Sequence, residues 1–443
     1  MTLQARLDRL PWSRYQWQVA GTLAFCFAFE LADINSFAYA APAVHHALRV
    51  GFRAVSVVTA AGFLGMFTGA ALGGRLAERF GRRRGLRASV VWFSVCSLAN
   101  AAAFDATTLT AARFLTGCGL GAMTVVAVTY LAELVPANQR GRLQASTLAA
   151  GLPGIPAMAF SARAVIGLGP QGWRLIFVFG ALGLVPLVIT RWLPESPAWL
   201  LAHGRAAEAA DAVAAIEGRV GRPLPPVVVA APVPVPPRLR ARLLFFGPLG
   251  RRTVLLMTVW VLLTISYYGF ASFAPALLHD HGFTLTHSVG YTALTTLGAV
   301  PGALLAWPVA DRFGMRGPIT VLSLLFAGSG VAYGLTFAPT AIVVFGFLVA
   351  ALNQALVALM YSYTPRLFPV EIRATATGIC YGAGRLLNAF GPLVVGQIYL
   401  TLGYTPVFVF VGACGALIAV SVLALAPRRA ALAPVAEPAP SPA

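Results

Sequence analysis

The sequence predicts an all-α membrane protein with twelve transmembrane helices in two pseudo-symmetric six-helix bundles. Three observations carry this prediction. Of the 443 residues, 58% are hydrophobic and only 10% are charged, and the mean hydropathy is +0.78, which is more apolar surface than a water-soluble domain could bury. Twelve apolar segments are each long enough to cross a bilayer. Loop motifs of the first half return in the second half at a constant spacing.

Six spans are predicted in the first half of the chain. Residues 1–16 are polar and basic, and we expect them to run along the inner membrane surface. Apolar stretches then recur with short polar loops between them. The predicted spans are residues 18–42, 54–77, 86–104, 109–132, 143–168 and 173–193. We therefore assign residues 1–193 to an N-terminal six-helix bundle.

A linker and six further spans make up the second half. Residues 194–250 form a predicted cytoplasmic linker, with a helical pattern at 206–217 and a proline-rich stretch at 223–237 that excludes regular structure. Residues 251–426 form the predicted C-terminal six-helix bundle, and residues 427–443 a disordered cytoplasmic tail. The predicted spans of this bundle are residues 252–278, 287–310, 317–337, 340–364, 374–401 and 404–426.

The two halves repeat each other at an offset of 233 positions. The motif Glu-Arg-Phe-Gly that begins at Glu78 returns as Asp-Arg-Phe-Gly at Asp311. The same offset relates Arg140 to Arg373, two loops further along each half. One offset shared by two loops indicates duplication of a six-helix unit. In duplicated transporters the binding site lies between the repeats near mid-membrane.

The distribution of arginine predicts the topology. The formal net charge is +18, there is no lysine, and 26 of the 32 arginines fall in the N-terminal segment, the tail and every second loop. Three arginines fall in the intervening loops and three deep within spans; arginines at the ends of spans are counted with the adjoining loops. This positive-inside pattern places both termini in the cytoplasm of a multi-pass protein of a bacterial inner membrane. The charge is thus explained by the lipid bilayer, and we expect no nucleic-acid partner.

Several classes of chemistry have no matching pattern in the sequence. All five cysteines lie within predicted spans and none has metal-ligand spacing. There is neither a phosphate-cradling GxxxxGK[ST] loop nor a nucleophile with a paired base. We therefore expect no enzyme activity, no cofactor and no metal, and we expect an ion gradient rather than ATP as the energy source. We also expect the protein to work as a monomer.

Four sequence motifs resemble those of a known superfamily. The stretch Gly-Arg-Leu-Ala-Glu-Arg-Phe-Gly-Arg-Arg that begins at Gly74 resembles the loop signature of the major facilitator superfamily. Arg-Phe-Leu-Thr-Gly at Arg113, Glu-Leu-Val-Pro at Glu133 and Pro-Glu-Ser-Pro at Pro194 are similar to the branch that holds sugar porters, organic-ion transporters, aromatic-acid/proton symporters and nicotinate transporters. The resemblance implies the major facilitator fold and secondary active transport by alternating access.

The same resemblance implies a set of cytoplasmic loop residues that latch the inward side. Two positions depart from the repeat: Trp307 stands where Gly74 would recur, and Arg366 stands where Glu133 would recur. The alternative interpretation is that these charges set topology and form exposed pairs worth about 0 to 1 kcal/mol each. The predicted gating residues are Gly74, Glu78, Arg79, Arg82, Glu133, Arg140, Asp311, Arg312 and Arg373.

Two acids in the first span are the candidate proton-coupling groups. Glu30 and Asp33 are three residues apart and lie about halfway across the membrane, where an ionised acid costs about 2.5 to 3.5 kcal/mol. Arg113 in the fourth span is the expected partner of both, and the sugar-porter resemblance implies this proton-linked pairing. Asp33 is preferred over Glu30. The alternative is a static ion pair that only orients helices.

Arg385 in the eleventh span is the candidate substrate-binding group. Together with Tyr381 and Asn388 it forms a polar stripe at helical spacing, which suits a carboxylate. An arginine that snorkels or pairs with a carbonyl is the alternative. Aromatic rings that could wall a pocket and amides that could bind hydroxyl groups complete the predicted site. These residues are Phe37, Tyr267, Tyr268, Tyr361, Asn353 and Gln354.

Charge counting leads to the functional prediction. With Arg163 included, the spans hold three positive and two negative groups, a net charge of +1. A monoanion carried with a proton leaves this balance unchanged, whereas a cation would add to a positive site. We therefore expect symport of protons with a small organic acid anion, aromatic or nicotinate-like. A sugar or polyol symporter, a drug or metabolite exporter and a non-transporting sensor remain alternatives, and the direction of transport is open.

Overall fold

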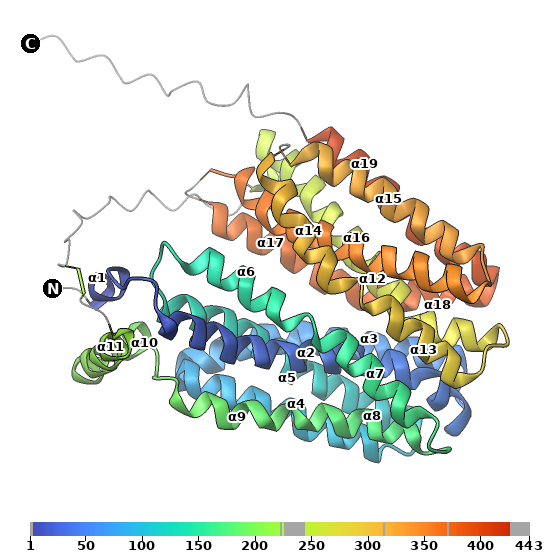
Figure 1. Cartoon of the computed structure of the whole chain (residues 1–443), viewed down its shortest axis with the longest axis horizontal. Helices are drawn as coiled ribbons and strands as arrows, with labels where there is room; N and C mark the ends of the chain where they lie inside the picture. The colour runs from blue at the N-terminus through green and yellow to red at the C-terminus, as the bar shows by residue number, and fades with distance from the viewer. Residues whose placement is uncertain (1–2, 222–223, 226–243, 313–314, 370–371, 426–443) are drawn as a thin grey trace, which may run out of the picture.

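The computed structural model consists of helices and contains no strand among the residues that it describes, which are 3–221, 224–225, 244–312, 315–369 and 372–425. The helices of the first half gather in one bundle and those of the second half in another, with their axes running roughly alongside each other (Figure 1). This arrangement confirms the predicted all-α membrane fold with two six-helix bundles.

The N-terminal bundle holds six membrane-crossing units. The first begins where Ser13 caps the helix, because its hydroxyl accepts a hydrogen bond from Tyr15 N, while the Gln16 side chain accepts one from Ser13 N. The six units are α2 (Arg14–Ala47), α3 (Phe52–Phe80), α4 (Arg82–Ala102), α5 (Ala106–Leu134), α6 with α7 (Arg140–Gly151 and Gly154–Ile166), and α8, η1, α9 and η2 (Gly172–Ala181, Leu182–Leu184, Val185–Ile189 and Thr190–Trp192).

The C-terminal bundle repeats this pattern. Its units are α12 (Gly247–Asp280), α13 with α14 (Leu285–Thr296 and Ala299–Arg312), α15 (Arg316–Gly334), α16 (Pro339–Arg366), α17, η4 and α18 (Arg373–Leu387, Asn388–Phe390 and Gly391–Leu402), and α19 (Tyr404–Ala424). Among the described residues, ten of the twelve units are long and apolar enough to cross a membrane on those criteria alone. The other two are α4, which starts with an arginine cluster, and the unit that η4 interrupts.

The linker and the N-terminal segment lie at one end of the bundles, which we call the linker end; the other is the opposite end (Figure 1). α1 (Leu3–Asp8), α10 (Pro197–Ala202) and α11 (Ala206–Val220) are found there. α11 confirms the helical pattern predicted at 206–217. The predicted disordered tail and most of the proline-rich stretch lie outside the described residues.

The duplication is visible in backbone contacts. On α3, a Cβ added to Gly69 would lie 1.9 Å from the carbonyl oxygen of Cys118 on α5. On α14, a Cβ added to Gly302 would lie 2.0 Å from the carbonyl oxygen of Ala351 on α16. Both residues of the second contact follow those of the first by 233 positions. These glycines therefore allow close packing of neighbouring helices.

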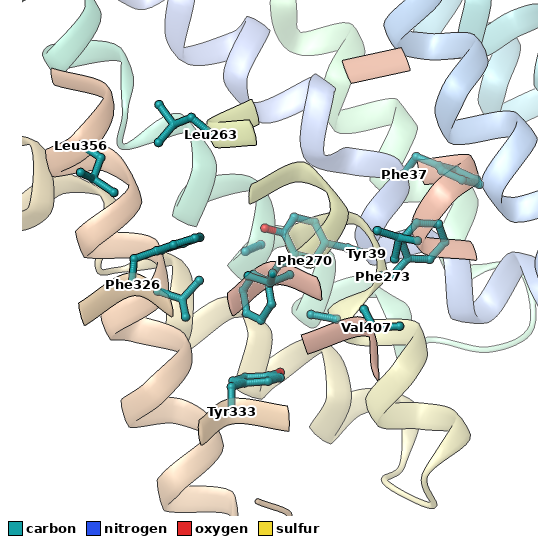
Figure 2. Close-up of a cluster of buried hydrophobic side chains, with 14 of the residues drawn as sticks. Phe37, Tyr39, Leu263, Phe270, Phe273, Phe326, Tyr333, Leu356 and Val407 are labelled. Atoms are coloured by element: carbon teal, nitrogen blue, oxygen red, sulfur yellow. The ribbon is translucent and has the colours of Figure 1, made fainter. Parts of the chain in front are cut away.

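The hydrophobic cores show which end of the molecule is closed. One core joins the C-terminal bundle to the opposite-end halves of the N-terminal helices, and Figure 2 shows Phe37 and Tyr39 of α2 beside Phe270 and Phe273 of α12. A second core combines the linker-end halves of the N-terminal bundle with α11. Across the bundle interface α7 packs along α13 and α3 along α18, while α6 and α14 approach each other much less. The bundles are thus joined at the opposite end.

Candidate functional site

Asp33 and Arg113 form an ion pair inside the N-terminal bundle. Asp33 is fully buried, and its Oδ2 lies 3.6 Å from Nη1 of Arg113. Ser97 of α4 donates a hydrogen bond to Oδ1 of Asp33 at 2.8 Å. The predicted approach of Arg113 to Asp33 is confirmed. Ser97 was not predicted, because a serine in an apolar helix usually bonds its own backbone.

The guanidinium of Arg113 also borders the space between the bundles. It donates to the Ser36 hydroxyl at 3.2 Å and lies over the rings of Phe37 and Phe177 at 5.8 and 6.0 Å. A small cavity of about 10 Å³ is lined by Arg113 and Phe37 from one bundle and by Ser272 from the other. This is about the room that one water molecule needs.

Glu30 has different surroundings, and the prediction that it shares Arg113 with Asp33 is wrong. Glu30 as a residue is only 3% exposed, and Thr124 of α5 donates a hydrogen bond to its Oε1 at 2.5 Å. Residues three apart on a helix differ by about 60° around the axis, so two acids of one face can meet different neighbours. Asp33 points into the N-terminal bundle, and Glu30 lies within electrostatic reach of Arg385 in the other bundle.

Arg385 is half-buried on α17 and has a free face. Its Nε donates to the hydroxyl of Tyr381 at 2.8 Å, and its guanidinium lies 5.4 Å from the centre of that ring. Glu30, Tyr268 and Tyr361 are its other electrostatic neighbours. Among the described residues, no carboxylate lies within 4.0 Å of it and its terminal nitrogens have no hydrogen-bond acceptor. The terminal nitrogens of Arg385 can therefore donate hydrogen bonds to a bound anion.

Aromatic rings surround this guanidinium. Trp260 of α12 lies 5.0 Å from Tyr361 and 5.2 Å from Tyr381, between ring centres, and these two tyrosines lie 5.5 Å apart. Tyr268 meets Phe63 of the N-terminal bundle at 4.9 Å. Sequence reasoning found the tyrosines and missed Trp260, because a tryptophan in a span is usually packing. Here it holds both tyrosines in place.

The remaining predicted substrate residues divide into two groups. Tyr267 is buried and contacts Tyr268, and Gln354 is half-buried. Asn353 and Asn388 are buried, and Oδ1 of Asn353 and both amide atoms of Asn388 have no partner among the described residues. Asn388 begins η4, so the predicted stripe does not continue as one regular helix past it. An unpartnered buried amide is costly unless a ligand or water satisfies it.

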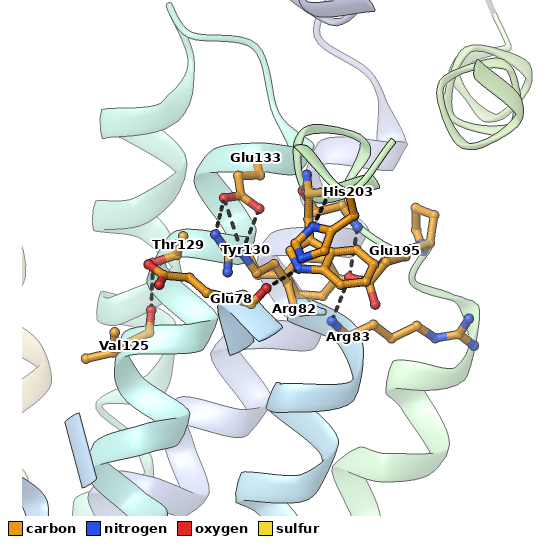
Figure 3. Close-up of polar contacts among 12 residues, drawn as sticks. Glu78, Arg82, Arg83, Val125, Thr129, Tyr130, Glu133, Glu195 and His203 are labelled. Carbon is orange, nitrogen blue, oxygen red and sulfur yellow. Dashed lines mark hydrogen bonds and ion pairs between the residues drawn. The ribbon is translucent and has the colours of Figure 1, made fainter. Parts of the chain in front are cut away.

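Two of the predicted gating residues of the N-terminal half, Arg82 and Glu133, contact each other at the linker end (Figure 3). Arg82 and Glu133 form an ion pair at 3.1 Å. Glu195 accepts a hydrogen bond from Arg83 N at 2.9 Å and so caps the start of α4. The backbone at Gly81 has φ +101°, and a Cβ there would lie 2.5 Å from the Glu195 carboxylate. Glu195 was not predicted as part of this network.

Other predicted gating residues are arranged differently from what we expected. Arg140 donates to the carbonyl of Val135 and Arg373 to that of Phe368, each at 3.4 Å and again 233 positions apart. Gly74 has room for a side chain, since an added Cβ would meet only Val125 at 3.8 Å. Glu78 and Arg79 are exposed, and the Glu78 carbonyl accepts from the Trp199 indole at 2.6 Å. The side chains of Asp311 and Arg312 lie outside the described residues.

No contact of this network reaches the C-terminal bundle in the part of the chain that the structure describes. Each side-chain partner lies in the N-terminal bundle or in the linker. Arg366, the residue that replaces an acid in the second half, is exposed at the end of α16. Among the described residues, the side chains of Arg82, Glu133 and Glu195 therefore form no contact with the C-terminal bundle.

Comparison with known proteins gives a consistent picture. A family model described as "Sugar (and other) transporter" matches residues 17–432. The chain is 40% identical to the Bacillus subtilis protein YyaJ over 92% of both chains, and 29% identical to the niacin transporter NiaP of Acinetobacter baylyi over 89% of this chain and 90% of NiaP. The xylose transporter XylE of E. coli, in a partially occluded inward open conformation, superposes with a TM-score of 0.72 at 20% identity and covers 94% of this chain and 98% of XylE. The chain therefore belongs to the sugar (and other) transporter family, a branch of the major facilitator transporters.

Proposed function

We propose that this transporter carries a small organic acid anion with an aromatic or nicotinate-like ring, together with a proton, by alternating access. The free face of Arg385 is the observation that carries the proposal. It offers charged donors to a carboxylate, and Trp260, Tyr361 and Tyr381 offer flat apolar surface to a ring. The relative that transports niacin, a pyridine carboxylic acid, supports this choice of cargo.

Glu30 links the anion to the proton in this proposal. Burial of the Glu30 carboxyl opposes its ionisation, and without substrate the charge of Arg385 and the hydrogen bond from Thr124 favour the ionised form. A carboxylate bound to Arg385 cancels that attraction, and the buried Glu30 then takes a proton. By linkage, a proton on Glu30 strengthens binding of the anion to the same degree. Anion and proton therefore bind and leave together, which is symport.

Asp33 is a second site for the same proton in the proposal. Its charge is compensated by Arg113, which borders the cavity between the bundles. If Arg113 turns towards that cavity as the bundles move, Asp33 is left buried without its counter-ion and must take a proton. Asp33 would then couple the proton to the motion, while Glu30 couples it to the substrate.

The remaining predicted features complete the cycle. We propose that the linker end faces the cytoplasm of a bacterial inner membrane, with both termini inside, and that the protein acts as a monomer. The present conformation is then closed to the outside. In the outward-facing state the gating residues Glu78, Arg79, Arg82 and Glu133 would meet the C-terminal bundle and close the inner side.

A sugar or polyol is the second candidate cargo. The buried amides of Asn353 and Asn388 lack partners among the described residues and could bind hydroxyl groups. An arginine is not required for a neutral sugar. Arg385 therefore distinguishes the two cargoes.

The test is uptake into proteoliposomes with an imposed pH gradient, using labelled nicotinate, 4-hydroxybenzoate and xylose. We expect uptake of an aromatic acid that a protonophore abolishes. Loss of charged hydrogen bonds worth about 1.5–3 kcal/mol each predicts that Arg385→Ala lowers acid uptake by about tenfold or more.

Arg163→Gln is the matched control, since Arg163 lies between α7 and α13 beside His287 and Tyr291, away from Arg385. It should leave acid uptake unchanged. Acid uptake that survives Arg385→Ala, or wild-type uptake of xylose alone, would overturn the proposed cargo. Uptake that ignores the protonophore would overturn the coupling.

A further inference from the structure

Two histidines face each other across the bundle interface at the opposite end. His46 lies at the end of α2 and His279 at the end of α12, and the two positions are 233 apart, so the duplication relates them. Their Nε2 atoms are 3.0 Å apart, and the ring planes meet at 79°. This is hydrogen-bond distance, and it joins the two bundles directly.

The carbonyl groups nearby determine which nitrogen carries each hydrogen. Nδ1 of His279 lies 2.8 Å from the carbonyl oxygen of Phe283, so it must donate to that oxygen. Neutral His279 therefore presents the lone pair of Nε2 to its partner. His46 must then donate its Nε2–H across the interface. The neutral pair is held by one N–H···N hydrogen bond.

The surroundings of the pair contain one acid and one further histidine. His45 of α2 lies next to His46, with ring centres 5.2 Å apart, and its Nδ1 is 2.5 Å from the carbonyl of Val50. Asp280 of α12 accepts a hydrogen bond from the hydroxyl of Tyr399 on α18. Asp280 and His45 are the charged or titratable groups in the described residues that act on His46 besides His279. One carboxylate can offset one positive imidazole.

The number of added protons decides whether the hydrogen bond between His46 and His279 can form. With one added proton on Nδ1 of His46, that ring is an imidazolium that still donates its Nε2–H to His279, so a single N–H···N bond remains. With two added protons, both Nε2 atoms carry hydrogen and no lone pair is left between them. Two positive rings then face each other 3.0 Å apart at an exposed site, and the hydrogen bond is replaced by a repulsion. An isolated histidine changes its charge between about pH 5 and pH 8, and because the first positive ring opposes the second proton, the doubly charged state forms towards the acid end of this range.

We propose that His46 and His279 form a proton-binding site that keeps the opposite end closed with at most one added proton and releases it when both rings are protonated. The site is separate from Glu30, Asp33 and Arg385. It depends on the two-bundle arrangement and not on the identity of the cargo. If the opposite end faces the more acidic side of the membrane, low pH on that side opens the transporter to the compartment that supplies its protons.

The test is a distance measurement between the bundles in the full-length protein. Spin labels are attached through Thr107→Cys on α5 and Thr401→Cys on α18, both exposed at the opposite end, after replacement of the native cysteines. Between about pH 8 and pH 5 we expect the wild-type distance distribution to shift to longer distances. His46→Gln or His279→Gln, each of which removes one of the two charges, should abolish the shift.

Two further variants make the result decisive. The double variant His46→Lys with His279→Lys imitates the doubly charged state and should give the long distance at pH 8. His287→Gln removes an exposed histidine of the same end that stacks on Tyr291, and it should behave as the wild type. A wild-type distance that does not change with pH, or an equal shift in both glutamine variants, would overturn the proposal. Neither result depends on whether any cargo is transported.

Discussion

The acids of α2 show how much depends on the direction in which one side chain points. Asp33 and Glu30 are both almost fully buried, yet Asp33 is paired with Arg113 and Glu30 is bonded to the neutral hydroxyl of Thr124. An arginine at a distance, Arg385, supplies the positive charge that acts on Glu30. Two acids that lie three residues apart on one helix can therefore have separate roles.

Glu30→Gln tests the role proposed for Glu30. Glutamine imitates the protonated acid, so the anion should bind and exchange without a proton. A gradient of about one pH unit supports about tenfold accumulation in a one-to-one symport of an anion and a proton. In the variant we expect accumulation to fall to about onefold, while exchange of labelled for unlabelled substrate persists. Both are measured in proteoliposomes.

Asp33→Asn is the comparison for this prediction. It removes the other acid but leaves Glu30 and Arg385 in place. If Glu30→Gln accumulates substrate as the wild type does, and Asp33→Asn does not, the coupling role belongs to Asp33 and not to Glu30.

The sequence was sufficient to identify most of the charged and aromatic groups of the candidate site, because a buried arginine or acid in a span is conspicuous. It was not sufficient to pair them. Arg113 was expected near both acids and meets one. Trp260 and Ser97 were not singled out, because tryptophan and serine are common packing residues of spans, and Glu195 was noted only as part of the motif at Pro194, without its contact to Arg83. Only their neighbours in space give them a role.

Among the helices, α3 and α5 are the pair most dependent on small residues. At Gly69 an added methyl group would lie 1.9 Å from the Cys118 carbonyl oxygen, so Gly69→Ala must push the helices apart. Overpacking of this kind costs about 1–3 kcal/mol. We expect a lower unfolding temperature for the purified protein, measured by differential scanning fluorimetry.

Gly21→Ala on α2 is the control, since nothing lies within 4 Å of the added methyl group. Alanine is the better helix former by about 0.5–1 kcal/mol, so this variant should unfold at the same or a slightly higher temperature. Equal destabilisation of both variants would contradict the packing interpretation.

The linker helix α11 is attached through a titratable contact. Arg6 and Arg9 of the N-terminal segment pair with Glu217 at 2.5 and 2.8 Å, and these arginines hold the pKa of the Glu217 carboxyl below its ordinary value. A lowered pKa means that the contact stabilises docking above the ordinary pKa of a glutamate, about 4.3, and that this contribution is lost as the pH falls through the folded value.

A spin label at the exposed position Ala214 of α11 reports this docking. We expect its mobility to rise as the pH falls below about 4.3 in the wild type, and to be high at neutral pH in Glu217→Gln. Glu208→Gln removes an exposed pair with Arg205 and should not change it. If the label is equally immobile in Glu217→Gln and in the wild type, the apolar face of α11 is sufficient to dock this helix.

Long periodic helices were predictable from the sequence, and their interruptions only in part. Apolar length and arginine placement located all twelve units, since a span must be long and its flanks charged. The short helix η4, which divides the eleventh unit, is followed at once by Pro392, which cannot donate a hydrogen bond to the carbonyl of Asn388 four residues earlier. The proline marks a break, but the 3-10 form that η4 takes there also depends on packing against α3 and α12, which leaves no local pattern.

For the molecule as a whole, closure of the opposite end depends on close contacts between α3 and α18. At Gly396 an added Cβ would lie 2.1 Å from Oγ and 3.0 Å from Cβ of Ser56. Gly396→Leu should therefore hold the opposite end open at every pH. We expect a long distance between labels at Thr107 and Thr401 in this variant.

Gly378→Leu on α17 is the matched control, because nothing lies within 4 Å of an added Cβ there. It should give the wild-type distance. A short distance in Gly396→Leu would mean that α18 can yield without separating the bundles, and that this contact does not decide which end is closed.

The backbone-to-backbone contacts at Gly69 and Gly302 also constrain how the protein can move. Helices that contact each other's backbone carbonyl groups cannot slide without losing this close packing. The pair α3 and α5 and the pair α14 and α16 must therefore each move as a rigid unit. Bending is left to the units that are already interrupted, at Pro153 between α6 and α7 and at η4 between α17 and α18. This transporter would thus alternate between its two states by rotation of two rigid helix pairs about a few flexible helix breaks.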